Sequence, residues 1–192
     1  MAQPTVVLAS SSLSRRLALD LLGLEYEIAS PGIDEKAIRH DDPSELTRLL
    51  SEAKALAIGE SRTDSCVVVA GDAVVALGSQ ILEKPADMAE AFSMLSAYSG
   101  RTVSFVTGLA TYHTTTRQMY STVAHSDLKF RTILETEVRA YMKSYPVLSF
   151  AGAFEGDAVF RFVERVEGSP NFRTAMPVSQ LAVLLRKQGV TV

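Results

Sequence analysis

A run of hydroxyl side chains and two arginines near the N-terminus have the types and spacing that bind an anion. The serines at positions 10–12 follow an apolar, β-branched run, and Arg15 and Arg16 precede a second apolar stretch. This order predicts a strand, a short polar turn and a helix N-terminus, whose unpaired N–H groups attract anions. Ser12 or Ser14 can cap that helix, and Arg15 can hold a phosphate with two hydrogen bonds. The same pattern also fits a capped surface helix with a solvated arginine pair.

Asp72 lies within an otherwise apolar run over residues 67–75. A carboxylate there is costly to bury without a partner, and acids in such places often act as general bases or metal ligands. The pair Gly71 and Asp72 also fits a simple loop between two short strands. Both interpretations remain open on this segment alone.

Further charged side chains can join Asp72 in a site. Asp34 and Glu35 follow a Pro-Gly turn; paired acids at a turn usually face water, but with Asp72 they offer the hard oxygen ligands that Mg²⁺ and Mn²⁺ prefer. Lys54 has small neighbours that would let it approach a cleft, and Lys84 precedes a proline that restricts its backbone. Each lysine alone is more typical of a solvated position.

Other catalytic patterns are missing from the sequence. The histidines have no metal-ligand spacing, no glycine loop of the Walker type occurs, and no serine lies in a nucleophile elbow. Attack by an activated water is therefore a better hypothesis than covalent catalysis. Cys66, the only cysteine, adjoins an apolar run and is predicted to be a buried small hydrophobe.

Apolar patterns of helix and strand period alternate along the chain, which predicts an α/β fold. No repeat or linker divides the sequence, so residues 1–192 are expected to form one domain. The strand expected over residues 66–77 is predicted to be interrupted at Gly71 and Asp72. Strands are predicted at residues 5–9, 26–29, 66–77, 102–112, 116–130 and 159–166. Helices are predicted at residues 12–22, 43–58, 87–98, 135–144 and 178–187.

The composition is that of an ordinary folded protein, with 47% hydrophobic and 21% charged residues among 192. A net charge of −3 gives no general attraction to nucleic acid or anionic lipid, so phosphate binding needs a local basic pocket. The first residues are too few and too polar for a signal peptide, and no apolar run approaches membrane-spanning length. We therefore expect a cytoplasmic protein without nucleic-acid or membrane partners.

Taken together, the order of these motifs resembles the Maf family of nucleoside triphosphate pyrophosphatases, from about residue 5 to 188. The resemblance implies a mixed α/β sheet like that of the inosine triphosphate pyrophosphatases, with two lobes flanking a deep nucleotide cleft. It implies hydrolysis of a nucleoside triphosphate between the α- and β-phosphates, a divalent cation (Mg²⁺, Mn²⁺ or Co²⁺) as cofactor, and a homodimer. The matching segments are Leu8-Ala9-Ser10, Ser12, Arg15-Arg16, Asp34-Glu35, Lys54-Ala55, Gly71-Asp72 with Val74, Lys84-Pro85, Ser99-Gly100, Thr107-Gly108 and Ala151-Gly152.

The resemblance also implies a role for each matching residue. Asp72 would be the general base that activates water, and Glu35 with Asp72 would bind the metal. A triphosphate carries about four negative charges. A metal held by acids on one side, and Ser, Arg and Lys side chains on the other, can hold the triphosphate in line for attack by water. The residues implied to bind the phosphates are Ser10, Ser12, Arg15, Lys54 and Lys84.

Three positions are implied to select the base, namely Ser14, Ala73 and Asp157. The branch acting on dTTP and UTP typically has Arg, Thr and Gln there, and the 7-methyl-GTP branch has an aromatic, Gln and Glu. This chain matches neither set, but Asp157 keeps the acid of the 7-methyl-GTP branch, which can pair with a cationic methylated purine. Ser14 cannot stack on a base and Ala73 offers no side-chain hydrogen bond. We therefore expect a methylated or other non-standard nucleotide, 7-methyl-GTP-like first, or a less selective pocket.

A function of another class is the alternative: a catalytically weak nucleotide-binding protein acting in cell-division (septum) control. The presence of Asp72, Lys54 and Lys84 favours the enzyme, because a pure sensor would not need a base. A nucleic-acid-binding regulator is poorly supported by the acidic net charge.

Overall fold

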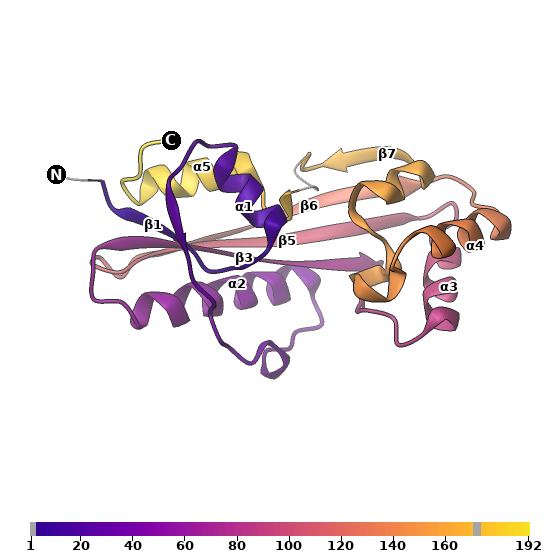
Figure 1. Ribbon diagram of the computed structural model, residues 1–192, viewed down its shortest axis with the longest axis horizontal. Coiled ribbons are helices and arrows are strands. Elements are labelled where there is room, and N and C mark those ends of the chain that lie inside the picture. The colour runs from indigo at the N-terminus through magenta and orange to yellow at the C-terminus, as the bar shows by residue number, and fades with distance from the viewer. Residues whose placement is uncertain (1–2, 171–173) are drawn as a thin grey trace. The chain divides into compact units, whose positions relative to one another are not determined.

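The computed structural model describes residues 3–170 and 174–192, and its seven strands form one mixed sheet in the order β2-β1-β3-β5-β6-β7, with β4 paired to β3 (Figure 1). β1 is parallel to both β2 and β3, whereas β4 and β7 run antiparallel to β3 and β6. The predicted mixed α/β fold is confirmed. The strands are β1 (Thr5–Leu8), β2 (Tyr26–Ile28), β3 (Cys66–Leu77), β4 (Gln80–Leu82), β5 (Thr102–His113), β6 (Met119–Phe130) and β7 (Val163–Gly168). The helices are α1 (Leu13–Asp20), α2 (Pro43–Glu60), α3 (Met88–Ala97), α4 (Glu135–Ser144) and α5 (Val178–Lys187).

The chain divides into two compact units. The first contains Met1–Ala73, Thr107–Ala124 and Asn171–Val192, and the second contains Val74–Val106 and His125–Pro170. The chain therefore passes between the units inside three strands, β3, β5 and β6. Within the described ranges, no helix is long and apolar enough to cross a membrane.

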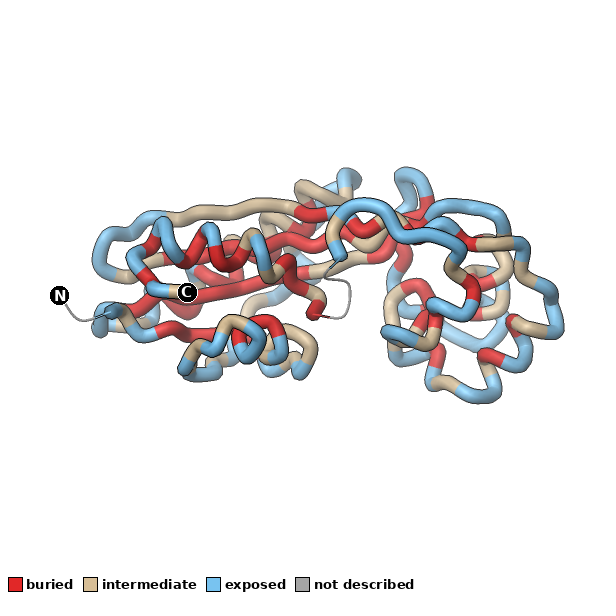
Figure 2. The backbone as a smooth tube through the Cα atoms, turned by 90° about the horizontal axis from the view of Figure 1, so that it is seen from above, coloured by how far each residue is buried: buried red, intermediate tan, exposed pale blue. Residues whose placement is uncertain are grey.

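Alternating side chains of β1 and β3 supply a core to both faces of the sheet in the first unit. One set packs with α1 and α5, and the other packs with α2. Figure 2 shows the buried residues running along these strands. The first set from the strands is Val6, Leu8, Val67 and Val69. The second set is Val7, Ala9, Val68 and Ala70, and it adjoins Cys66, whose predicted burial is confirmed.

The expected break at Gly71 and Asp72 is wrong, because β3 continues through both residues. The glycine serves close packing and not a turn: a Cβ there would lie 3.1 Å from the carbonyl oxygen of Gly108 and 3.2 Å from Met176 Cε. Asp72 therefore sits inside a buried strand, which fixes the direction of its carboxylate.

The strand predicted over residues 159–166 is also wrong in its first half. A 3-10 helix covers Gly156–Phe162, and the strand is Val163–Gly168. The spacing explains the error: Val159 and Phe162 are both buried and lie three residues apart, which is the 3-10 repeat.

Two glycines allow close contact between helix α2 and the sheet. It begins at an N-cap, Asp42, whose side chain accepts hydrogen bonds from two N–H groups of the first turn. A Cβ on Gly108 of β5 would overlap the carbonyl oxygen of Thr47, and a Cβ on Gly59 would overlap the ring of Tyr112. These contacts lie on either side of position 54 of the helix and set its height above the strands.

The second unit packs α3 and α4 around buried aromatic rings. Tyr98 donates a hydrogen bond of 2.6 Å from its hydroxyl to the carbonyl oxygen of Gly152, and its ring lies 5.2 Å from that of Phe130, centroid to centroid. Tyr141 accepts a hydrogen bond of 2.8 Å from the N–H of Glu155. Both hydroxyls therefore have partners in this core, as buried polar groups require.

Candidate functional site

The turn between β1 and α1 is built around a buried serine. The Ser10 hydroxyl oxygen accepts a hydrogen bond from the N–H of Ser12 at 3.2 Å and another from Nη1 of Arg15 at 3.3 Å. Ser12 stands at the N-cap position of α1, but among the described residues its side chain makes no capping hydrogen bond. The prediction that Ser12 caps the helix is therefore wrong, and Ser14 lies inside the helix. The first N–H groups of α1 stay available to an anion.

Arg15 lines a pocket of about 380 Å³ beside this turn. Burial lowers the pKa of its guanidinium, while the charges of Asp72 and Glu35 act in the opposite direction. Its Nε is buried and has no hydrogen-bond partner within the described part of the chain. An unpaired buried donor is costly, and a bound anion is one group that can satisfy it.

The centre of the site is an ammonium between two carboxylates. Lys54 Nζ lies 2.6 Å from Asp72 Oδ1 and 3.1 Å from Glu35 Oε2. Lys54 comes from α2, Asp72 from β3, and Glu35 from a short 3-10 helix, Glu35–Ala37. The Lys54 and Asp72 side chains are 6% and 10% exposed, whereas that of Glu35 is 54% exposed. The fold therefore brings together a buried carboxylate, a half-exposed carboxylate and a buried ammonium.

The two adjacent acids, Asp34 and Glu35, make different contacts. Asp34 Oδ1 accepts a hydrogen bond of 3.0 Å from the N–H of Lys36 and so caps the 3-10 helix. This cap turns Glu35 toward Lys54, while Asp34 itself is exposed. Of the predicted acidic pair, only Glu35 reaches the centre.

Asp72 has the electrostatics of a general base. Burial raises the pKa of its carboxyl, and the charges of Lys54 and Arg15 partly oppose that rise. A raised pKa makes the carboxylate a stronger base, and the neighbouring ammonium opposes its protonation. A buried acid with a perturbed pKa and a specific charged partner is a frequent mark of a functional site.

The loop after β2 also lines the pocket, and sequence analysis gave it no role. Its residues 30–33 include Gly32, whose φ of +60° is the left-handed conformation that glycine adopts without strain. The Pro-Gly pair was the available signal, since it marks a tight turn that returns the chain toward Glu35. The lining residues are Ala9, Ser10, Ser11, Ser12, Arg15, Ser30, Pro31, Gly32, Ile33, Glu35 and Lys54.

The remaining predicted residues lie in different surroundings. Ser14 and Ala73 belong to the first unit and are partly buried, next in sequence to Arg15 and Asp72. Lys84 and Asp157 belong to the second unit, where both are exposed. Their implied contacts with phosphate and base stay predictions.

Glu35 and Asp72 supply two hard oxygen donors, both in contact with the Lys54 ammonium, and their chemistry suits a divalent cation. Among the described residues, no group of three or more His, Cys, Asp or Glu side chains is placed to hold a metal. Mg²⁺ is usually bound through only one or two carboxylates plus substrate phosphates. The donor set here, two hard oxygen ligands beside a pocket with anion-binding groups, is of that kind.

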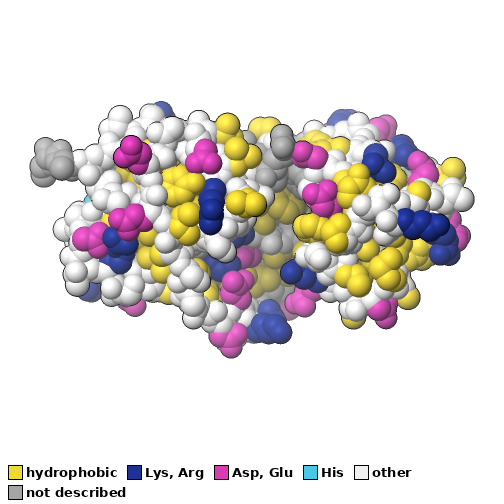
Figure 3. All heavy atoms as spheres, viewed as in Figure 1, with side chains coloured by type: hydrophobic (Ala, Val, Ile, Leu, Met, Phe, Trp, Pro, Cys, Tyr) yellow, Lys and Arg dark blue, Asp and Glu magenta, His cyan; other side chains and the backbone are white. Residues whose placement is uncertain are grey.

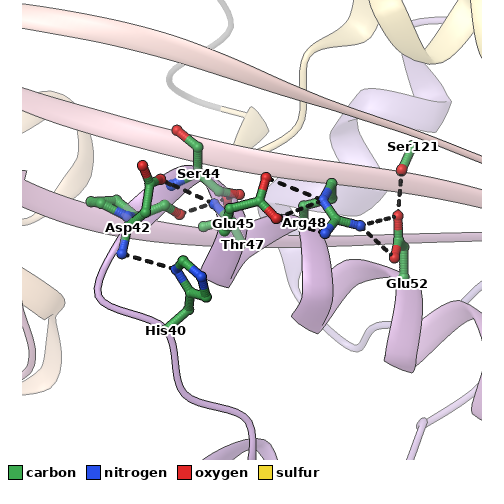
Figure 4. A network of polar contacts seen from close by, with 9 residues as sticks. His40, Asp42, Ser44, Glu45, Thr47, Arg48, Glu52 and Ser121 are labelled. Carbon is green, nitrogen blue, oxygen red and sulfur yellow. Dashed lines mark hydrogen bonds and ion pairs between the residues drawn. The ribbon is translucent and has the colours of Figure 1, made fainter.

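A second polar cluster, the surface network, lies on α2 (Figure 4). Arg48 Nη2 lies 2.6 Å from Glu45 Oε2, and Arg48 Nη1 lies 2.9 Å from Glu52 Oε2. Ser121 of β6 donates a hydrogen bond of 2.5 Å to Glu52 Oε1. Hydrogen bonds to Glu45 and Glu52 raise the pKa of Arg48 further above its ordinary value, so the guanidinium stays charged. The network ties α2 to the neighbouring sheet.

Known proteins resemble this chain over almost its whole length. A family described as "Maf-like protein" matches residues 5–188. The 7-methyl-GTP pyrophosphatase of Nitrosococcus oceani is 34% identical over 193 residues, which cover 100% of this chain and 96% of that protein. The dTTP/UTP pyrophosphatase of Deinococcus radiodurans is 37% identical over 189 residues, covering 98% and 95%. Among solved structures, a HAM1 protein from Coxiella burnetii shares the fold with a TM-score of 0.51 at 14% identity, covering 96% of this chain and 99% of that one.

Proposed function

The chain belongs to the Maf family, and from this premise we propose that it is a nucleoside triphosphate pyrophosphatase that releases a nucleoside monophosphate and pyrophosphate. One observation carries the proposal: the buried Lys54–Asp72 pair and Glu35 adjoin a pocket that also presents Ser10, Arg15 and the N-terminus of α1. Groups that bind phosphate and a group that can activate water thus belong to the same small region.

The phosphate-binding side offers hydrogen-bond donors and positive charge. Ser10, Arg15 and the first N–H groups of α1 face a pocket in which Lys54 supplies a further positive charge. We assign Ser12 and Lys84 to the same task by family resemblance. These donors hold the anhydride in place and stabilise the negative charge that grows on its oxygens during cleavage.

The chemical step uses Asp72. Its carboxylate accepts a proton from water, the water oxygen forms a bond to phosphorus of the α–β anhydride, and the bridging P–O bond breaks to release pyrophosphate. A divalent cation, Mg²⁺, Mn²⁺ or Co²⁺, would be held by Glu35 and Asp72 and would neutralise phosphate charge. The buried position of Asp72 keeps its base strength high.

We propose a methylated or non-standard nucleotide as substrate, with 7-methyl-GTP first. Relatives named for 7-methyl-GTP and for dTTP/UTP are similarly identical to this chain, at 34% and 37%, so identity alone does not choose between them. The acid at Asp157 favours a cationic methylated purine. Ser14 and Ala73, small side chains at the other two selecting positions, favour a pocket that tolerates more than one base.

The test is pyrophosphate release from a panel of triphosphates with Mg²⁺, Mn²⁺ or Co²⁺. The panel contains 7-methyl-GTP, GTP, dTTP, UTP, CTP and 5-methyl-UTP, and the products are separated by chromatography. We expect equal amounts of monophosphate and pyrophosphate, with 7-methyl-GTP preferred. Release of inorganic phosphate and a diphosphate, or no turnover with any metal, would overturn the proposal.

Other features of the protein remain predictions. These are the cytoplasmic location, the homodimer, and one Maf-like domain over residues 1–192. On the face shown in Figure 3, basic and acidic side chains are interspersed and form no continuous basic stripe. The absence of a nucleic-acid partner stays a prediction. The relatives reported above are named as pyrophosphatases, so the cell-division alternative has no support from them.

A further inference from the structure

We infer that the Lys54 ammonium and the divalent cation compete for the same two carboxylates, and that a triphosphate relieves this competition by offering Lys54 another partner. The inference rests on the proposed function in one respect, because it takes a divalent cation as the cofactor. It adds that Lys54 makes binding of metal and nucleotide depend on each other.

The contacts of Lys54 carry the argument. One ammonium touches both carboxylates, at 2.6 Å for Asp72 Oδ1 and 3.1 Å for Glu35 Oε2. A Mg²⁺ ion bound by the same two groups needs oxygen atoms at about 2.1 Å. Both cations would then lie within a few ångströms of each other, where repulsion is strong because little water screens it. Occupancy by one cation therefore disfavours the other.

Burial makes Asp72 the main point of this competition. The Asp72 side chain is 10% exposed, and the Lys54 side chain beside it is 6% exposed, so little water competes for either partner. Glu35 is 54% exposed and can leave the ammonium at little cost. A metal gains Glu35 easily but must displace Lys54 to gain Asp72.

The pocket offers the ammonium an alternative partner. Lys54 lines the same pocket as Ser10, Ser12 and Arg15, the groups placed to hold phosphate. When a phosphate oxygen takes the ammonium, the Asp72 carboxylate is released for the metal. Coupling of this kind is reciprocal, so nucleotide raises metal affinity by the same factor as metal raises nucleotide affinity.

The test is Mn²⁺ binding to the whole chain without nucleotide, measured by titration calorimetry. Lys54→Gln removes the competing charge, and we expect Mn²⁺ to bind about tenfold tighter or more, since a charge-assisted hydrogen bond no longer opposes it. Arg15→Gln is the matched control: it removes one positive charge near the same acids, but its Nη1 hydrogen bond goes to Ser10. We expect a much smaller change from this control.

Two results would overturn the inference. One is equal tightening in Lys54→Gln and Arg15→Gln, which would show a general effect of charge. The other is unchanged, weaker or undetectable Mn²⁺ binding in a folded Lys54→Gln. Should that variant fail to fold, the ¹⁵Nζ signal of Lys54 in the unsubstituted protein, assigned with Lys54→Arg, gives a second measurement. Saturating Mg²⁺ must shift this signal, and an unmoved signal would contradict the competition.

These measurements use no triphosphate, so they fail independently of the proposed function. If the protein releases pyrophosphate but Lys54→Gln and the unsubstituted chain bind Mn²⁺ equally well, the proposed function is supported and the competition is contradicted. If Mn²⁺ binds tighter to Lys54→Gln but no triphosphate is hydrolysed, the competition is supported and the proposed function is contradicted.

Discussion

Helix α2 carries two ion-pair systems only six residues apart, and they differ in almost every physical respect. Arg48 of the surface network has a side chain that is 33% exposed and pairs with two glutamates on its own helix. Lys54 is 6% exposed and pairs with acids from two other segments. The first system is local in sequence, and the second exists only once the fold has formed.

The difference in burial determines what each system costs. Exposed pairs gain little because water competes for both charges, whereas buried pairs must overcome the loss of hydration of each ion. The better-shielded contact of Lys54 with Asp72 is therefore weak evidence for stability. Its position beside a pocket of about 380 Å³ that Arg15 and Ser10 also line suggests a role in binding and chemistry instead.

The largest expected effect separates the two systems by activity. Asp72→Asn keeps the shape of the side chain but removes the base, so turnover should fall by roughly 10²-fold or more. Glu52→Gln makes the same chemical change in the surface network, and its turnover should stay within about twofold of the unsubstituted protein, as expected away from the site. Pyrophosphate release at saturating triphosphate measures both. Full turnover in Asp72→Asn would show that Asp72 is not the base.

The next effect concerns stability. Lys54→Met leaves Asp72 buried without its closest cation, and we expect a loss of about 3 kcal/mol in the free energy of unfolding. The double variant Lys54→Met/Asp72→Val replaces the pair by apolar groups and should recover to within about 1 kcal/mol of the unsubstituted protein, although it is inactive. Urea unfolding followed by circular dichroism gives these values. A double variant as unstable as the single one would show that the pair itself stabilises the fold.

A smaller effect is the direction of pH dependence, which is opposite in the two systems. Burial raises the pKa of Asp72, so the folded state favours its protonated form and the stability it contributes falls as pH rises through that pKa. Hydrogen bonds from Arg48 lower the pKa of Glu45, so its contribution is present above the ordinary glutamate pKa and is lost as pH falls.

The side-chain carboxyl ¹³C shifts test these signs. We expect Asp72 to titrate above, and Glu45 below, an ordinary carboxyl. Lys54→Gln should move Asp72 further up, because the ammonium partly opposes the effect of burial. An Asp72 that titrates like an exposed carboxyl would contradict its burial.

The sequence was sufficient for the elements that carry a clear period or cap. Helix α2 and the long strands β5 and β6 lie within a few residues of the ranges predicted for them, 43–58, 102–112 and 116–130. The break at Gly71 could not be excluded from sequence. The glycine is needed there because a side chain would crowd Gly108 and Met176, which are distant in the chain. Local patterns report local geometry, and that glycine responds to tertiary packing.

The site was predicted in its residue types better than in its contacts. The spacing of Asp72, Lys54 and Glu35 along the chain gives no hint that one ammonium bridges both acids. That contact depends on α2 approaching the sheet over Gly108, and on Asp34 capping the short helix that carries Glu35. Both arise from packing and hydrogen bonding that only the fold brings together.

The smallest expected effect is that of the surface network itself. Arg48→Met removes both ion pairs, and for the i,i+4 pair with Glu52 we expect a loss of only about 0.3–0.5 kcal/mol, because exposed pairs are screened by water. Urea unfolding at low salt and at 1 M salt checks this, since a Debye length of about 3 Å should remove most of the effect. Turnover should not change. A tenfold loss of turnover would instead show that the tie between Glu52 and Ser121 positions α2, and with it Lys54, for the reaction.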